Sequence, residues 1–244
     1  MNEGAVALHV AGTQLWLRPD CTVWWPDQST LFAADLHLGK GAAFRAQGQP
    51  VPAGRSAATL AHLEIAAQTC GAAQLVLLGD LWHHASGLSE ELHQQLASLT
   101  ARWPTMLVLG NPDRPLAKRA LQGLTISTCN TSLALGRLVA QHEPDFVKKG
   151  DAEVETAFGL AGHLHPAVHL GGRGGDRMRR PCFLHYAGGL VLPAFGRWTG
   201  AWAQWPKDYA AAGARVAVVG ESAVLWLPTA LSVESKIESR RRRL

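Results

Sequence analysis

Metal-binding residue types follow four short apolar segments of this sequence. The segments, with the polar residues after each, are Leu31–Ala34 with Asp35 and His37, Leu75–Leu78 with Asp80, Met106–Leu109 with Asn111, and Phe158–Ala161 with His163 and His165. Carboxylate and amide oxygens and imidazole nitrogens bind divalent cations such as manganese, iron and zinc. An Asp-x-His triplet alone would more often be a surface feature, but the repetition along the chain predicts one metal site.

The apolar segments have to position these donors, and each segment is predicted as a buried strand. Strands that are covered on both faces are continuously apolar rather than alternating. Donors at the carboxyl ends of such strands meet at the edge where open α/β sheets hold their sites. Glycine comes directly before Asp80, Asn111 and His163. There it lets the backbone turn and pass close to a neighbouring group.

Helices are predicted between the strands of the first half. Arg55–Thr69 has helical periodicity and ends at Gly71 as a C-cap, Leu88–Arg102 begins after Ser89 as an N-cap, and Arg114–Gln122 is a shorter helix. This order of strand and helix implies parallel strands with right-handed crossovers.

Short strands dominate the rest of the chain. An N-terminal hairpin is predicted from Ala5–Val10 and Gln14–Leu17, with Thr22–Trp25 as a further strand. The candidates after Gly123 are Thr125–Thr128, Ser132–Leu135, Leu138–Gln141, Val154–Leu160, Ala167–Leu170, Met178–Ala187, Leu190–Pro193, Trp202–Gln204, Arg215–Val219 and Ala223–Leu227. We expect this second half to form a second, mostly antiparallel sheet. Two facing sheets with helices outside give an α/β/β/α sandwich.

Composition limits the class of protein. The chain has 244 residues, of which 47% are hydrophobic, and this is enough for one substantial core. We predict a single domain over residues 1–233 and a basic, disordered tail over residues 234–244 that carries most of the net charge of +4. Without a basic leader or an apolar run near the ~20 residues of a membrane span, a soluble cytoplasmic protein is expected. The four cysteines lack CxxC spacing and are expected to be free thiols.

Basic residues near the predicted donors are candidates for holding a phosphodiester. Lys40 and Arg45 follow the first donor pair, and Gly39 and Gly41 would free this loop to pass close to a ligand. A second group lies in a glycine-rich segment after His165. Its members are Arg173, Arg177, Arg179 and Arg180. This group either lies beside the site or forms a solvated hairpin loop, and the sequence leaves both open.

The order DxH, GDxxH, GN, a lone histidine and GHxH resembles the calcineurin-like binuclear metallophosphoesterases. More narrowly, the chain resembles their ligase-associated DNA damage response endonuclease branch, called PdeM or MPE, from about Leu31 to Trp198. The narrower resemblance is carried by ADLHLGKGAAFR, VLLGDLWHH, the HEP of His142–Pro144, AGHLHPAVHLGGRG, RRPCF and LVLPAFGRWTG.

The resemblance implies two divalent metal ions and their ligands. One ion would be held by Asp35, His37, Asp80 and His165, and the other by Asp80, Asn111, His142 and His163, with Asp80 bridging. The implied metal is Mn²⁺, with iron or zinc as alternatives, and the pair would activate water for attack on phosphorus. His142 ends the strand-like run Leu138–Gln141. A lone histidine there is more often a surface residue, but the ligand set needs another imidazole, so we predict it as a ligand.

Pro112 departs from the family motif. In the family, Gly-Asn is followed by a histidine that is implied to contact the phosphate and protonate the leaving oxygen, whereas this chain reads Gly110-Asn111-Pro112-Asp113. Proline carries no proton to donate, and general acid catalysis contributes typically 10²–10⁴-fold. Cleavage of DNA, which has a poor leaving group, is therefore expected to suffer far more than cleavage of activated esters.

His83 matches a histidine that contacts phosphate in the branch. We interpret it as an auxiliary donor, with packing at the rim of the site as the alternative. Together with Lys40, Arg45 and Arg173 it makes up the predicted substrate contacts. Asp113 is expected to cap the helix that begins at Arg114.

Three functions remain open at the level of the sequence. The branch resemblance implies a manganese-dependent phosphodiesterase that cuts single-stranded or locally opened DNA in repair, with a DNA ligase and a helicase as partners. A second possibility is hydrolysis of a nucleotide sugar or another small phosphodiester, because DLHLG and GD also occur in pyrophosphatases of the lipid A pathway. The third is a metal-binding but hydrolytically weak component of a repair assembly, in which Pro112 has disabled the chemistry.

Overall fold

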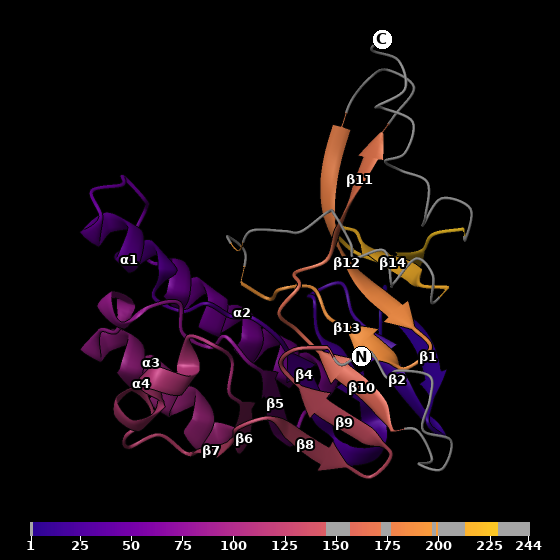
Figure 1. The fold of residues 1–244 in the computed structure, drawn as a ribbon, viewed down its shortest axis with the longest axis horizontal. Coiled ribbons are helices and arrows are strands. Elements are labelled where there is room, and N and C mark those ends of the chain that lie inside the picture. The colour runs from indigo at the N-terminus through magenta and orange to yellow at the C-terminus, as the bar shows by residue number, and fades with distance from the viewer. Residues whose placement is uncertain (1, 145–156, 172–176, 197–198, 200–212, 229–244) are drawn as a thin grey trace.

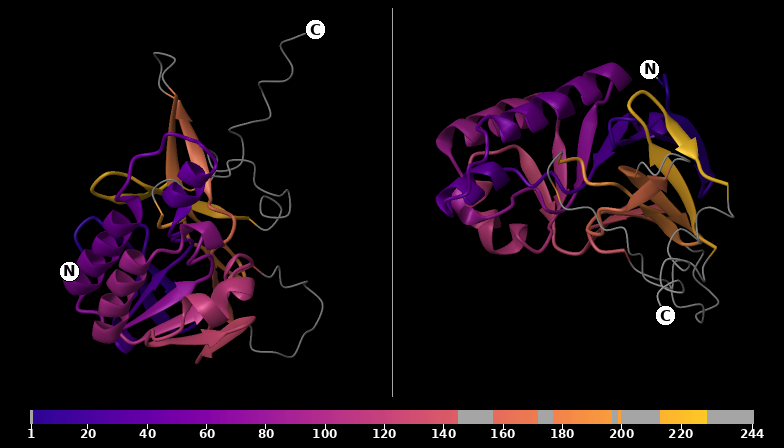
Figure 2. Two further views of the ribbon diagram at one scale, coloured as in Figure 1. Left: turned by 90° about the vertical axis from the view of Figure 1, so that its left-hand side faces the viewer. Right: turned by 90° about the horizontal axis from the view of Figure 1, so that it is seen from above.

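The computed structural model describes residues 2–144, 157–171, 177–196, 199 and 213–228. Two mixed β-sheets face each other, and the α-helices lie on the outer side of the first sheet (Figures 1 and 2). The predicted two-sheet α/β sandwich is therefore confirmed. Residues 234–244, predicted as a basic tail, lie outside the described residues.

The first sheet contains seven strands in sequence order. They are β1 (Val6–Val10), β2 (Thr13–Leu17), β3 (Val23–Trp25), β4 (Thr30–Ala33), β5 (Gln74–Leu78), β6 (Thr105–Val108) and β7 (Ile126–Cys129). The pairs from β1 to β4 are antiparallel, which confirms the N-terminal hairpin. The pairs from β4 to β7 are parallel, as the alternation of strands and helices predicts.

Four α-helices are described, together with two short 3₁₀ turns. The α-helices are α1 (Lys40–Ala46), α2 (Arg55–Cys70), α3 (Glu90–Arg102) and α4 (Asp113–Ala120), and the turns are η1 (Pro26–Gln28) and η2 (Ala85–Gly87). Ser89 caps α3 by accepting the Leu92 N–H at 3.2 Å, and Gly71 ends α2 with a φ of 72°. Both predicted caps are confirmed.

The second sheet carries the remaining strands. They are β8 (Ser132–Leu135), β9 (Leu138–Gln141), β10 (Phe158–Ala161), β11 (Ala167–Gly171), β12 (Arg177–Tyr186), β13 (Gly189–Val191), β14 (Arg215–Val219) and β15 (Val224–Trp226). Most pairs are antiparallel, but β10 is parallel to both β9 and β13. The β11–β12 hairpin projects away from the body of the molecule (Figure 1).

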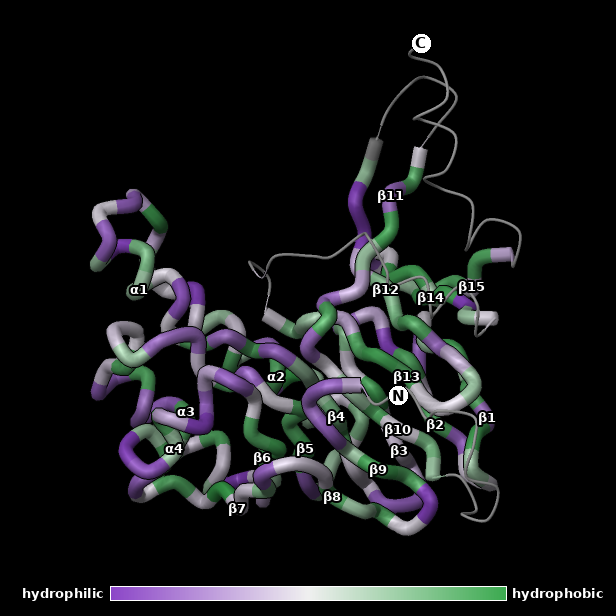
Figure 3. Tube along the Cα trace, viewed as in Figure 1, coloured by the Kyte–Doolittle hydropathy of each residue, from purple (hydrophilic) through white to green (hydrophobic). Residues whose placement is uncertain are grey.

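Two cores hold these layers together. Leu31 and Ala33 of β4 pack with α2 and α3, while Phe32 and the following Ala34 pack between the sheets. Strand β5 alternates in the same way, so the continuous apolar runs are buried on both faces. Hydrophobic segments accordingly follow the inner strands in Figure 3. The carboxyl ends of β4 and β5 are therefore fixed between two packed layers.

Two predictions about elements are wrong. Thr125–Thr128 was assigned to the second sheet, but the corresponding β7 is parallel to β6 in the first, because α4 completes another right-handed crossover. The segment after Gly39 was predicted as a loop, but α1 begins at Lys40, with Gly39 as N-cap at a φ of 79°. Gly41 therefore lies inside a helix. Among the described residues, no helix is both long and apolar enough to cross a bilayer.

Candidate metal centre

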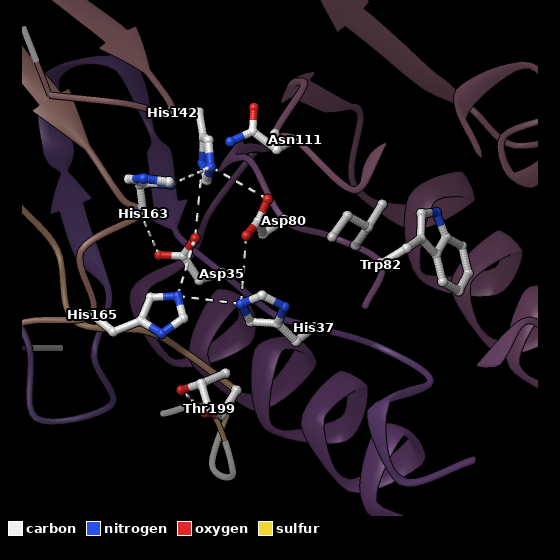
Figure 4. Close-up of polar contacts among 12 residues, drawn as sticks. Asp35, His37, Asp80, Trp82, Asn111, His142, His163, His165 and Thr199 are labelled. Carbon is white, nitrogen blue, oxygen red and sulfur yellow. Dashed lines mark hydrogen bonds and ion pairs between the residues drawn. The ribbon is translucent and has the colours of Figure 1, made fainter. Parts of the chain in front are cut away.

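Carboxylates and imidazoles from both sheets converge at one edge of the sandwich (Figure 4). Asp35 and His37 follow β4, Asp80 follows β5, His142 follows β9, and His163 and His165 follow β10. The segments after β4 and β5 stay side by side, because the His37 N–H donates to the Asp80 carbonyl at 2.8 Å and the Leu38 N–H to the Leu81 carbonyl at 2.8 Å. This extension of the strand pairing holds the imidazole of His37 beside the carboxylate of Asp80.

One group of donors lies on the β4 side of the cluster. One ligand atom from each of four residues lies within 4.8 Å of the others, and these residues are Asp35, His37, Asp80 and His165. The two imidazole Nε2 atoms, of His37 and His165, are 3.2 Å apart. His37 Nε2 is 3.6 Å from Asp80 Oδ2, and His165 Nε2 is 3.6 Å from Asp35 Oδ1. These are the four residues that the resemblance assigns to the first ion.

A second group lies on the other side of Asp80. His142 Nε2 is 3.3 Å from Asp80 Oδ1 and 3.1 Å from His163 Nδ1. The two carboxylate oxygens of Asp80 thus face different imidazoles, Oδ1 toward His142 and Oδ2 toward His37. A carboxylate in this position is suited to bridge two cations.

The hydrogen bonds of His142 test whether a cation fits here. Its Nδ1 lies 3.0 Å from the Leu78 carbonyl oxygen, so Nδ1 carries the proton and Nε2 presents a lone pair. That lone pair faces Oδ1 of Asp80, and within the described residues Oδ1 of Asp80 and of Asp35 is buried without a hydrogen-bond partner. Opposed lone pairs in a buried site repel unless a cation lies between them. The donor set therefore fits divalent cations.

Burial shifts the pKa values of two donors, and only the shift of His37 favours metal binding directly. Desolvation, with the neighbouring His165 as the next cause, lowers the pKa of His37 to about 2, so its imidazole stays neutral. Desolvation and the nearby Asp35 raise the pKa of Asp80 to about 7. A cation would reverse the second effect, because positive charge favours the ionised carboxylate.

The backbone at the site is unusual. Eight described non-glycine residues have positive φ, and five of them are predicted ligands: Asp35 at 54°, His37 at 47°, Asp80 at 47°, His163 at 69° and His165 at 45°. This left-handed conformation is disfavoured for residues with a Cβ and persists where the surrounding structure enforces it. Concentration of such strain at one cluster is an independent indication of a functional site.

The glycines before the ligands make room for ligands from other strands. A Cβ on Gly79 would collide with the His142 imidazole, and a Cβ on Gly110 would collide with the Asp80 carboxylate. A Cβ on Gly162 would lie 2.7 Å from Asp35 Oδ2. The segments after β5, β6 and β10 therefore each carry a glycine that lets a carboxylate or imidazole from another segment approach, as the sequence pattern predicts.

Asn111 lies at the rim beside Asp80 and His142 (Figure 4), and Pro112 follows it in the chain. The Asn111 side chain is exposed, its Nδ2 donates to Glu143 Oε1 at 3.1 Å, and its Oδ1 accepts from Arg114 at 3.3 Å. A ligand role needs Oδ1 turned toward the cluster, so it remains a prediction. Pro112 is the N-cap of α4 with a φ of −67° and offers no side-chain hydrogen bond.

Asp113 has a different position from the helix cap that was predicted. It is the first residue of α4 and is fully buried. Its carboxylate accepts the N–H groups of Gly110 and Leu81 through Oδ2, at 3.0 and 3.2 Å, and that of Trp82 through Oδ1, at 3.0 Å. It therefore ties the loop after β6 to the loop after β5. Burial raises the pKa of Asp113 while these three N–H donors lower it.

His83 and Lys40 lie next to the imidazole of His37. The rings of His37 and His83 are perpendicular, with centroids 5.5 Å apart, and His83 makes a similar contact with Phe44 at 5.8 Å. Lys40 Nζ is 5.6 Å from the Phe44 centroid. Desolvation lowers the pKa of both Lys40 and His83. Both side chains border the cluster, and their contacts with a substrate remain predictions.

The predicted arginine contacts lie farther out. Arg45 is exposed, and its guanidinium donates to the carbonyls of Val51 and Pro52 at 3.1 and 3.2 Å. Arg173 lies outside the described residues. Arg179 and Arg180 line a cavity of about 590 Å³ on the His165 side of the cluster. The glycine-rich hairpin therefore begins beside the site, although its tip is not described.

Two residues at the site were missed or misread from the sequence. Asp113 follows Pro112 directly, and its acidic character was interpreted only as a helix cap, since the partners of its carboxylate come from another loop. Phe44 was missed because the segment was predicted as a loop.

Comparisons with known proteins agree with this geometry. Neither the scan of protein-family models nor the search of curated proteins gave a match. The solved structure of the Pseudomonas putida nuclease MPE is 30% identical in sequence with a TM-score of 0.72, and the match covers 91% of this chain and 100% of that one. YfcE, a phosphoesterase from E. coli, is 18% identical over 80% of this chain and 95% of its own, with a TM-score of 0.43, which is too low to carry an argument. The strand-end donors and the similarity to the nuclease together show that this chain belongs to the calcineurin-like metallophosphoesterases, in the MPE branch.

Proposed function

We propose that the protein is a manganese-dependent binuclear phosphodiesterase that cuts single-stranded or locally opened DNA in the course of repair. The observation that carries the proposal is Asp80, whose two carboxylate oxygens face imidazoles on opposite sides. The similar P. putida protein is a nuclease, and this supports DNA as the substrate. Oxygen and imidazole donors without a thiolate suit manganese, and also iron or zinc. Association with a DNA ligase and a helicase is part of the proposal.

The residues of the cluster divide into holding and positioning roles. Asp35, His37, Asp80 and His165 would hold one ion, and Asp80, His142 and His163, with Asn111, the other. Two ions would neutralise the phosphate and supply an activated water near neutral pH. Lys40, beside His37, is placed to attract a phosphate oxygen by charge. The ring of His83 contacts that of His37, and His83 would donate a proton to the leaving oxygen.

Pro112 supports a second candidate, a metal-binding component with weak hydrolytic activity. The residue lies at the N-cap of α4 and has no group that can donate a proton. A DNA sugar hydroxyl leaves poorly without protonation, whereas p-nitrophenolate leaves unaided. The two candidates therefore differ in the cleavage of DNA and agree in the cleavage of an activated ester.

Restoring a histidine separates these candidates. Pro112→His should raise cleavage of single-stranded DNA by roughly a hundredfold or more, the lower end of general acid catalysis, and change hydrolysis of methyl p-nitrophenyl phosphate far less. Both rates should be measured with Mn²⁺ and after chelation, and Asp80→Ala should abolish both. A wild type that cuts neither substrate would refute the enzymatic proposal. An equal rise in both rates would remove the leaving-group role of this position.

A preference among substrates tests the remaining alternative. Single-stranded, duplex and tailed DNA should be compared with a nucleotide sugar under the same conditions. The proposal requires cleavage of single-stranded or tailed DNA above the rate on duplex. Faster hydrolysis of the nucleotide sugar than of any DNA would select the small-substrate hydrolase instead.

A further inference from the structure

A small cavity of about 270 Å³ opens next to His37 and shares Gly196 and Thr199 with the larger cavity on the His165 side. Its walls come from the segment after β4, from α1, from the loop between α1 and α2, and from the start of α2. Apolar groups of Leu36, Phe44, Val51 and Pro52 line it, with the hydroxyls of Thr59 and Thr199 at its polar part. The volume is slightly below the ~300–1,000 Å³ of sites for drug-sized ligands, so it suits one ring system rather than an extended chain.

The charge around this cavity favours an anionic ligand. Lys40 and Arg55 line it, and none of its described lining residues is acidic. The larger cavity on the His165 side differs, because Asp20 and Glu221 line it and Arg180 is paired with Glu221 at 3.1 Å. A phosphodiester at the metal cluster therefore has a cationic and partly apolar neighbour on the His37 side.

The walls are held in place by contacts that do not involve a ligand. Arg45 fixes the loop wall through the carbonyls of Val51 and Pro52. On the opposite side, the Gly196 N–H donates to the Asp35 carbonyl at 3.2 Å, and the Thr199 hydroxyl donates to the Gly196 carbonyl at 2.8 Å. Phe44 is perpendicular to the His83 ring. A ring that enters the cavity thus contacts Phe44, which is already held in place beside the cluster.

We propose that this cavity binds the nucleobase of a nucleotide adjoining the bond to be cut, with the base against Phe44 and its phosphate drawn to Lys40. The inference rests on the proposed function, because it takes a nucleic acid as the substrate. It follows from an apolar, ring-sized cavity, an aromatic side chain and the ammonium of Lys40 in a lining without acidic residues, directly beside His37. Stacking of a base on an aromatic side chain tolerates different bases, so the cavity adds affinity without sequence preference.

Binding measurements test the cavity without relying on catalysis. Calorimetric titration of the Mn²⁺-loaded protein should compare thymidine 5′-monophosphate and thymidine 3′-monophosphate with 2-deoxyribose 5-phosphate, which has no base. At least one thymidine ligand should bind about fivefold or more tightly than the base-free ligand, as the lower range of stacking energies implies. Phe44→Ala should reduce that ratio to near one. Phe44→Leu, which keeps the apolar volume, should reduce it as well.

A matched control and a variant in the larger cavity complete the experiment. Ile65→Ala removes an apolar side chain from the exposed face of α2, 57% accessible and away from the cavity, and should keep the wild-type ratio. Equal binding of all three ligands to the wild type would overturn the proposal. So would a ratio that survives both Phe44 variants, or one that falls instead with Arg179→Gln in the larger cavity. Failure of the proposed function would appear separately, as absence of hydrolysis with binding intact.

Discussion

The buried carboxylate of Asp80 is placed to bind a cation, and its ionised form destabilises the metal-free protein. Its side chain is 11% exposed, and its Oδ1 faces the Nε2 lone pair of His142. Desolvation and the charge of Asp35 raise its pKa from 3.8 to about 7. A shift of this size corresponds to at most about 4 kcal/mol against the ionised form. When no metal is bound, this cost lowers the free energy of unfolding at neutral pH.

Replacing Asp80 by asparagine should therefore stabilise the metal-free protein above pH 7. A raised carboxyl pKa gives stability that is complete below the unfolded-state pKa and is lost as the pH rises through the folded-state value, here about 7. The gain in the free energy of unfolding of Asp80→Asn should thus be small at pH 4 and grow to roughly 1–3 kcal/mol at pH 8. Urea denaturation of both proteins in chelator, at both pH values, measures it.

The difference between wild type and variant is the informative quantity, because His37 titrates in the opposite sense. Its lowered pKa removes stability as the pH falls below 6.5 in both proteins, so this contribution cancels. The same gain at pH 4 and pH 8 would show that the buried charge is not its source. In Mn²⁺ the order should reverse, with wild type the more stable.

Residue types predicted the cluster well, because ligands of one site share chemistry and each follows an apolar run. The structure brings Asp35, His37, Asp80, His142, His163 and His165 together, and their assignment as ligands awaits a metal. Spacing did not reveal the role of Asp113, since its hydrogen bonds reach the N–H groups of Leu81 and Trp82 about thirty positions away. Such a partner is set by the tertiary fold.

At the scale of elements, adjacent strand ends are packed so closely that one added methyl group should disturb the site. Gly110 follows β6 and faces the Asp80 carboxylate that follows β5. Its φ is not positive, so an alanine here would be tolerated by the backbone and opposed only by contact. This makes the glycine a probe of spacing alone.

Gly110→Ala should displace Asp80 and lower Mn²⁺ affinity and activated-ester hydrolysis at least about tenfold. Gly159→Ala is the matched control, because the added Cβ on β10 would meet neighbours only at 3.5 Å and beyond. Calorimetry and kcat/KM for methyl p-nitrophenyl phosphate give both quantities. If the two variants lose activity equally, the loss reflects general disturbance of the sheets and the spacing argument is wrong.

Elements with strong periodicity were predicted nearly to the residue, as with α2 and its C-cap Gly71. The short helix α1 escaped prediction, because its two glycines, Gly39 and Gly41, indicate a loop and a seven-residue helix has little periodicity to detect. Strand β7 was found but assigned to the wrong sheet. A four-residue strand with the burial pattern of an edge carries no information about its partner.

At the scale of the molecule, the cluster joins the two sheets. Asp35 and Asp80 come from the first sheet, while His142, His163 and His165 come from the second. Besides the apolar layer between the sheets, these residues form polar contacts that join the two sheets at this edge of the sandwich. Bound cations would therefore act on the stability of the whole fold as well as on chemistry.

Saturation with Mn²⁺ should raise the melting temperature of the protein. At a free metal concentration of about 100 times Kd the stabilisation is about 2.7 kcal/mol, or roughly 5–11 °C for a chain of this size. Hydrogen exchange should slow at the ends of both sheets, around Asp80 and around His163. His163→Asn should lose most of the shift, while His9→Asn, on the N-terminal hairpin, should keep it. Protection confined to the first sheet would argue against a joint site.

The two-sheet architecture followed from the order of strands and helices, but the pairing of strands between distant segments did not. Strand β10 runs parallel to β13, with β11 and β12 between them in the chain. Nothing local in Phe158–Ala161 selects that neighbour over an antiparallel one. The neighbour of β10 is set by the tertiary fold.

The left-handed backbone at Asp35, His37, Asp80, His163 and His165 separates what folding favours from what catalysis needs. Glycine would adopt these angles without steric penalty. A library of variants selected for thermal resistance alone should thus accumulate glycine at the ligand positions. The selected proteins would be more stable but would lose metal binding and hydrolysis. Selection for phosphoester hydrolysis would instead retain the aspartates and histidines despite their backbone strain.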